Sequence, residues 1–61
     1  MMLEQFAKEY GMAVDYMDQN TGNIYRLTDA IDDGEGGLLV PVTASYGDSI
    51  LIGYAKMQKP E

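Results

Sequence analysis

No cysteine and no histidine occur among the 61 residues of the chain, so neither a disulfide nor a thiolate or imidazole metal site can hold its fold together. A chain of this length buries about 60% of the surface that its unfolded form exposes, and it has residues for one hydrophobic core only. We therefore expect a single domain over residues 1–61 with little stability to spare. Oligomerisation or partner binding would supply the missing stabilisation.

The charge of the chain is strongly negative, because ten Asp and Glu residues oppose four Lys and Arg residues, for a net charge of −6. The four cations are too scattered to form the basic stripe that binds phosphates, so we expect no direct nucleic-acid binding. An acidic surface instead attracts a protein partner with a basic surface. No apolar run approaches the roughly 20 residues of a membrane-spanning helix, which predicts a cytoplasmic protein without membrane contact.

The N-terminal half has the pattern of a helix followed by a hairpin. Apolar residues three and four positions apart predict a helix over residues 2–10 that ends at Gly11; they are Leu3, Phe6, Ala7 and Tyr10. Apolar residues then alternate on both sides of the turn-rich stretch 18–23, which predicts a hairpin over residues 12–28 with its first strand from Met12 to Met17.

The C-terminal half begins with an acidic, glycine-rich loop over residues 29–37. Thr28, just before the loop, could cap a single helical turn through Ile31. A second hairpin is expected over residues 38–57, followed by a polar tail at 58–61. Pro41 belongs at a sheet edge or a bulge. The predicted fold class is α+β, with a short N-terminal helix packed on a three- or four-stranded antiparallel sheet made of two hairpins. Because one short helix cannot cover such a sheet, the remaining apolar surface predicts a homodimer.

The acidic loop is the strongest candidate for a ligand site, since four of its seven residues from 29 to 35 are carboxylates. These are Asp29, Asp32, Asp33 and Glu35. The twelve-residue calcium-binding loop fails here, because a start at Asp29 puts Ile31 and Val40 at ligand positions three and twelve. A solvated acidic loop is therefore favoured, and we predict no metal and no cofactor.

Catalysis is not expected, because the groups that it requires are missing or misplaced. Ser45 and Ser49 have no histidine to activate them, and Glu35 between glycines lacks the fixed, dry position of a general acid. The sequence GEGG lacks the lysine of a phosphate-binding loop. We predict that the chain is not an enzyme.

The predicted function is a non-catalytic acidic protein-binding module that regulates or inhibits a larger protein. Its candidate contact residues are the four acids of the loop together with Tyr46 and Asp48 at the next turn, because tyrosine is favoured at interfaces. In general character such a chain resembles phage and mobile-element regulators, with no motif that identifies a family. Two alternatives remain open: a nucleic-acid mimic that occupies the basic groove of a DNA-binding protein, and a small structural subunit that adds a strand through residues 38–44.

Overall fold

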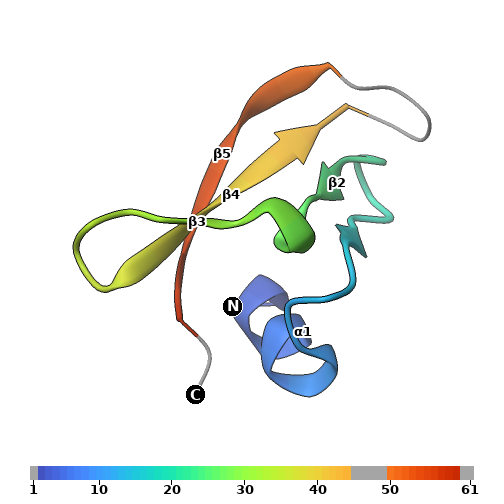
Figure 1. The fold of residues 1–61 in the computed structure, drawn as a ribbon. Helices are drawn as coiled ribbons and strands as arrows, with labels where there is room; N and C mark the ends of the chain where they lie inside the picture. Colours follow the sequence, from blue (N-terminus) through green and yellow to red (C-terminus); the bar gives the residue numbers. More distant parts are fainter. Residues whose placement is uncertain (1, 45–49, 60–61) are drawn as a thin grey trace.

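The computed structural model describes residues 2–44 and 50–59, in which one helix packs on a five-stranded antiparallel sheet (Figure 1). The elements in chain order are α1 (Met2–Tyr10), β1 (Tyr16–Met17), β2 (Ile24–Tyr25), the 3₁₀ turn η1 (Leu27–Asp29), β3 (Ile31–Asp32), β4 (Gly37–Thr43) and β5 (Leu51–Gln58). The α+β class and the order of helix, hairpin and hairpin are confirmed.

Strand β4 is the centre of the sheet. It pairs with β5 along its whole length on one side, and on the other side with β3 at Leu38 and Leu39 and with β2 at Val42 and Thr43. The sheet has more strands than predicted, because β3 lies in the segment 29–37 that was expected to be a loop. The hairpin between β3 and β4 makes part of that segment a strand.

Pro41 does not lie at a sheet edge, so the prediction that residues 38–44 provide an open edge is wrong. The Pro41 carbonyl accepts a hydrogen bond of 2.8 Å from the backbone N–H of Arg26. In an antiparallel strand the N–H and C=O of one residue point to the same neighbour, so the missing N–H of Pro41 faces the side of β2. There the chain leaves the sheet as η1 between β2 and β3, and the proline therefore interrupts no pairing with β5.

Helix α1 ends as the sequence predicts. Gly11 has a φ of +78°, and its N–H donates to the carbonyl of Ala7 at 2.8 Å, which is a left-handed C-terminal cap. The following strand is shorter than expected, because residues 12–14 bend and pairing begins only at Tyr16. This bend carries the chain from the helix to the sheet.

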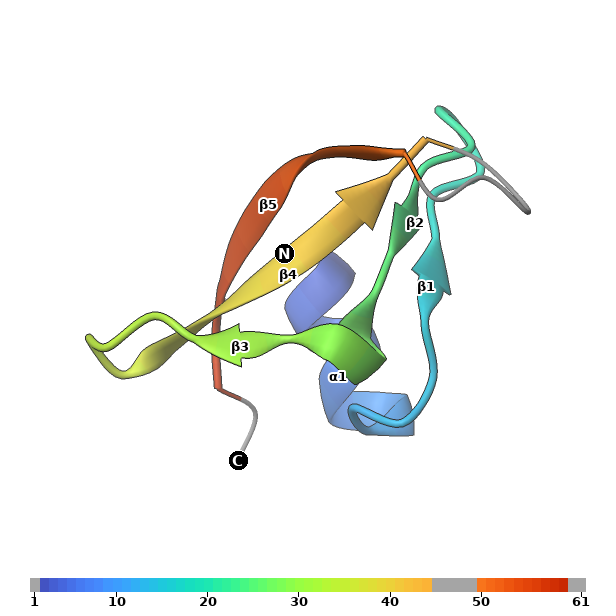
Figure 2. The ribbon, with the colours of Figure 1, turned by 45° about the horizontal axis from the view of Figure 1, so that its top comes forward.

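The hydrophobic core lies between α1 and one face of the sheet, and Figure 2 shows the helix behind the strands. Its buried cluster contains Leu3 and Ala7 from α1, Leu27 from η1, Val40 from β4 and Met57 from β5. Tyr10, predicted on the same helix face, is instead 60% exposed, because it lies in the last turn beyond the sheet. Within residues 2–44 and 50–59, no helix has the length and apolarity that crossing a membrane requires.

Candidate functional site

Three of the four predicted loop acids are engaged by the chain itself. Asp29 forms an ion pair of 2.8 Å with Nη2 of Arg26, and Asp32 forms one of 2.7 Å with Nζ of Lys59. Asp33 accepts hydrogen bonds from backbone N–H groups of its own hairpin, and Glu35 lies exposed near the hairpin tip. Three of the loop acids therefore bind other groups of the chain and do not form a free acidic cluster, although Asp29 and Asp32 remain more than half exposed.

Asp33 shapes the turn between β3 and β4. Its Oδ1 accepts hydrogen bonds from the N–H of Glu35 at 2.7 Å and from the N–H of Gly37 at 3.0 Å. These two bonds, the first being the stronger influence, hold the pKa of Asp33 below its ordinary value of 3.8. Gly34 and Gly36 have φ values of +83° and +86°, a conformation that glycine adopts without strain.

Asp32 and Lys59 tie the start of this hairpin to the end of β5. The hydrogen bond from Lys59, followed by that from the N–H of Gly34, lowers the pKa of Asp32, and the same contact raises the pKa of Lys59. Both side chains are at least half exposed, so the pair is worth little in stability. It still positions the hairpin against β5.

The remaining predicted contact residues, Tyr46 and Asp48, lie outside the described residues. Among the residues that are described, no group of three acidic side chains could hold a metal ion.

Outside the acidic loop, Asp15 has a structural role that the sequence does not reveal. Its Oδ1 accepts hydrogen bonds from the N–H of Thr28 at 3.1 Å and from Oγ1 of Thr28 at 2.9 Å. Its Oδ2 lies 3.3 Å from Nε of Arg26. Asp15 thus joins the chain before β1 to η1, thirteen residues later, and no local spacing signals such a contact.

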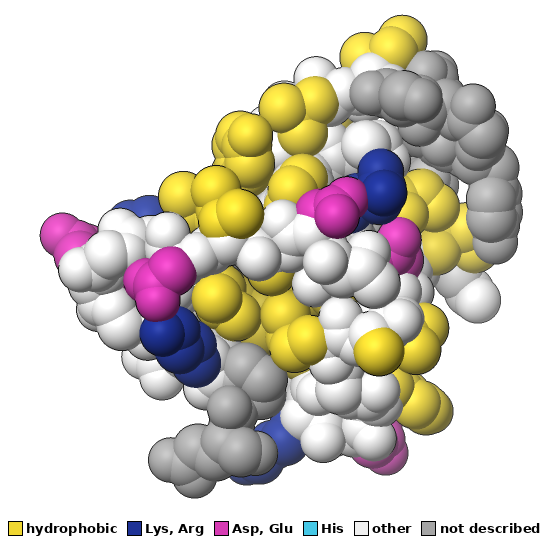
Figure 3. Space-filling view, viewed as in Figure 1, with side chains coloured by type: hydrophobic (Ala, Val, Ile, Leu, Met, Phe, Trp, Pro, Cys, Tyr) yellow, Lys and Arg dark blue, Asp and Glu magenta, His cyan; other side chains and the backbone are white. Residues whose placement is uncertain are grey.

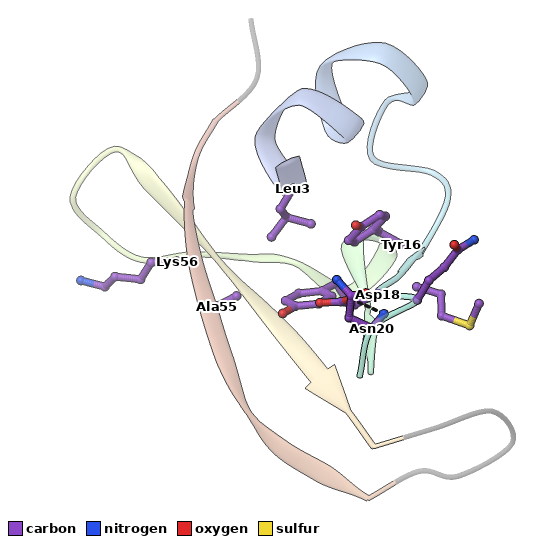
Figure 4. Close-up of a pocket in the computed structure, with 9 residues that line it drawn as sticks. Leu3, Tyr16, Asp18, Asn20, Ala55 and Lys56 are labelled. Carbon is purple, nitrogen blue, oxygen red and sulfur yellow. Dashed lines mark hydrogen bonds between the residues drawn. The ribbon is translucent and has the colours of Figure 1, made fainter. Parts of the chain in front are cut away.

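A groove of about 680 Å³ lies between α1, the hairpin of β1 and β2, and β5. Its lining residues are Leu3, Tyr16, Met17, Asp18, Gln19, Asn20, Tyr25, Ala55 and Lys56. In Figure 4, Leu3, Tyr16 and Ala55 surround the groove, while the side chain of Lys56 points away from it. The wall is apolar and aromatic, and the hairpin loop supplies a polar rim.

The aromatic side chains of the groove continue into a row of rings. The ring centroids of Tyr25 and Tyr16 are 5.7 Å apart, those of Tyr16 and Phe6 are 4.9 Å apart, and those of Phe6 and Tyr10 are 4.8 Å apart. All three pairs are tilted, which is a favourable geometry for aromatic rings. The row runs from β2 through β1 to the exposed end of α1.

The face of the sheet opposite α1 is a second surface of unusual composition. Residues paired directly across the strands share a face, and the Arg26 to Pro41 bond extends the β2 pairing by one residue. Three rows therefore cross this face: Ile31, Leu39 and Lys56 in the first, Arg26, Pro41 and Tyr54 in the second, and Ile24, Thr43 and Leu51 in the third. We call these nine residues the open face; Thr43 among them is buried, and the pairing with β5 shifts register between Val42 and Thr43.

Hydrophobic side chains dominate the open face, although its rim is charged. Tyr54, Ile31 and Leu51 are 54%, 51% and 49% exposed. In Figure 3, hydrophobic atoms gather over β4 and β5, with acidic and basic side chains beside them. Exposed apolar surface with a polar rim is typical of a protein interface.

A comparison of the chain with protein-family models, with curated proteins and with solved structures found no match. The groove and the open face therefore have to be interpreted from their own chemistry.

Proposed function

We propose that the chain is a non-catalytic protein-binding module that holds a basic, extended segment of a larger protein in the groove, and thereby regulates or inhibits that protein. The observation that supports this most directly is the row of aromatic rings that opens into a cavity of an acidic protein. Self-association is part of the same proposal, because the buried core is small.

The groove suits a cationic side chain. The faces of Tyr16 and Tyr25 carry a partial negative charge that attracts lysine or arginine, by about 0.5–2 kcal/mol for each contact. Asp18 lies on the rim of the groove, and its Oδ1 already accepts a hydrogen bond of 2.9 Å from the N–H of Asn20. That bond fixes the carboxylate at the rim without neutralising its charge.

The rest of the chain strengthens this preference through its long-range field. The net charge of −6 raises the local concentration of a basic segment and its rate of association. Because this attraction acts through solvent, salt screens it, with a Debye length of about 8 Å at physiological ionic strength. Binding in the groove should therefore weaken as the salt concentration rises.

The mimicry of a nucleic acid draws less support from the geometry. A mimic presents free carboxylates along one surface, whereas Asp29, Asp32 and Asp33 are held by Arg26, Lys59 and backbone N–H groups. The paired acids leave fewer charges to stand in for phosphates.

The outer edge of β5 favours a second candidate function, that of a small structural subunit that adds a strand to an assembly. Among the described strands β5 pairs only with β4, and Ile52 at this edge is more than half exposed. An unpaired strand edge is a template for another strand. Substituting Ile52→Lys should abolish assembly through this edge and leave binding in the groove unchanged.

The groove is tested with a short peptide of alternating lysine and glycine and an otherwise identical peptide of glutamate and glycine. We expect the lysine peptide to shift the backbone NMR signals of Tyr16, Asp18 and Ala55, and the glutamate peptide to shift none of them. Tyr16→Leu should weaken binding of the lysine peptide about tenfold, equivalent to about 1.4 kcal/mol. Tyr10→Leu is the matched control, because Tyr10 belongs to the ring row but not to the groove, and we expect less than a threefold change.

The proposal would be wrong if the lysine peptide shifted only the signals of the β3 to β4 hairpin. It would also be wrong if Tyr10→Leu weakened binding as much as Tyr16→Leu does.

A further inference from the structure

We infer that the open face is the interface of a symmetric homodimer, in which the sheets of two copies of this chain pack against each other. This inference gives the proposed self-association a surface, and it does not depend on what binds in the groove. The aromatic wall of the groove and the open face lie on opposite sides of the sheet, because Tyr25 lines the groove and its neighbour Arg26 belongs to the open face. The two surfaces meet at the rim of the groove, where Lys56 belongs to both and Met17 pairs with Ile24. A dimer would leave the aromatic walls of both grooves accessible.

The composition of the open face departs from that of a solvated sheet. An antiparallel sheet with one face in water normally alternates apolar residues toward the core with polar residues toward solvent. In β4 the core side presents Val40 and Val42, yet the open face presents Leu39 and Pro41, the residues that alternate with them. Both faces of the central strand are therefore apolar, although α1 covers only one of them.

The distribution of charge indicates a second copy as the occupant of this face. None of the nine residues of the open face is acidic, whereas two of them, Arg26 and Lys56, are cationic. The described acids lie in α1, around the groove, in the β3 to β4 hairpin, or beside Arg26 in ion pairs. Asp15 and Asp29 offset the charges of Arg26 and Lys56, so this face offers a basic partner no net attraction. A second acidic copy therefore meets less repulsion here than on the acidic parts of the surface.

The size of the face is sufficient for a small stable interface. A standard interface buries about 800 Å² on each partner, about a fifth of the accessible surface of 4203 Å². The molecule measures 29 × 23 × 18 Å, so one of its broad sides exposes an area of this order. In a two-fold dimer the open face of one copy packs against the open face of the other, so each exposed apolar residue is buried in both copies.

Sedimentation equilibrium over a range of protein concentrations tests the dimer directly. We expect the wild type to reach twice the monomer mass of 6.7 kDa, and Tyr54→Lys to raise the dissociation constant about a hundredfold, because the substitution occurs twice in one interface. Tyr10→Lys is the matched control. It removes a similarly exposed tyrosine and adds the same charge, but it lies in α1, so we expect less than a threefold change.

Leu51→Lys provides a second variant in case Tyr54→Lys fails to fold, which circular dichroism would show.

Salt separates this inference from binding in the groove, since screening reduces the repulsion between two copies of charge −6. The dimer should therefore tighten as salt is added, whereas the lysine peptide should be released. A wild type that stays monomeric at millimolar concentration in high salt would overturn the inference. Equal weakening by Tyr10→Lys and by the folded open-face variants would do so as well.

Discussion

Substituting Leu27→Ala should remove much of the stability of this protein. Leu27 is 2% exposed and is one of the two largest fully buried side chains among the described residues. Truncating a buried leucine to alanine costs about 2–5 kcal/mol, because the cavity that remains does not close. A 61-residue domain has about 3–9 kcal/mol in total. A loss of about 3 kcal/mol would therefore leave a partly unfolded population.

Urea denaturation followed by far-ultraviolet circular dichroism measures this loss. With a slope of about 1 kcal/mol per molar urea, the expected loss lowers the transition midpoint by about 3 M. Leu51→Ala is the matched control, because it makes the same chemical change at a leucine that is 49% exposed. Removing a half-exposed side chain should cost less than about 1 kcal/mol. Both variants are compared at a low protein concentration, so that self-association does not contribute.

The reasoning fails if Leu27→Ala and Leu51→Ala lower the free energy of unfolding equally. That result would mean that η1 does not anchor the core, and that the sheet and α1 hold together without it.

Three further predictions concern the polar framework. The pKa of the Asp33 carboxyl, measured by NMR titration, should lie below its ordinary value of 3.8. Because this pKa is lowered in the folded state, the contribution of Asp33 to stability is complete above pH 3.8 and disappears as the pH falls through the folded pKa. An observed midpoint above 3.8 would contradict this. Gly36→Ala should cost about 1 kcal/mol in a urea titration, since the residue has a φ of +86°, and an unchanged midpoint would show that the turn relaxes freely. Asp15→Ala should lower the thermal midpoint more than Glu9→Ala, because only Asp15 bonds to η1, and equal effects would count against that role.

The local elements of the fold could be predicted because their signals are local. The spacing of Leu3 and Ala7 marks the helix, and Gly11 marks its end. The turn at residues 18–23 and the apolar run of β5 mark the two hairpins. Each of these features depends on residues only a few positions apart.

The pairing of strands could not be predicted in the same way. Strand β3 has only two residues and forms because Asp33 orders the turn that follows it. Pro41 occupies a central strand because η1 leaves a gap beside it, between β2 and β3. Both features depend on contacts between segments that are distant in sequence. A proline or a run of acidic residues does not indicate which segments will meet.

The candidate sites show the same division. Four acids in seven residues predicted a binding loop, but the folded chain uses three of these acids for its own hydrogen bonds and ion pairs. The groove assembles from α1, β1, β2 and β5, and the open face from β2, β3, β4 and β5. Neither surface has a signature in one stretch of sequence.

Composition and short-range pattern alone thus determine a small acidic α+β chain with one helix and two hairpins, since charge, helix periodicity and turn residues act locally. Tertiary structure decides which strand is central, which acids are paired and which apolar residues stay exposed. The physical reason is that burial and ion pairing depend on which distant segments meet, and one helix can cover only one side of the sheet.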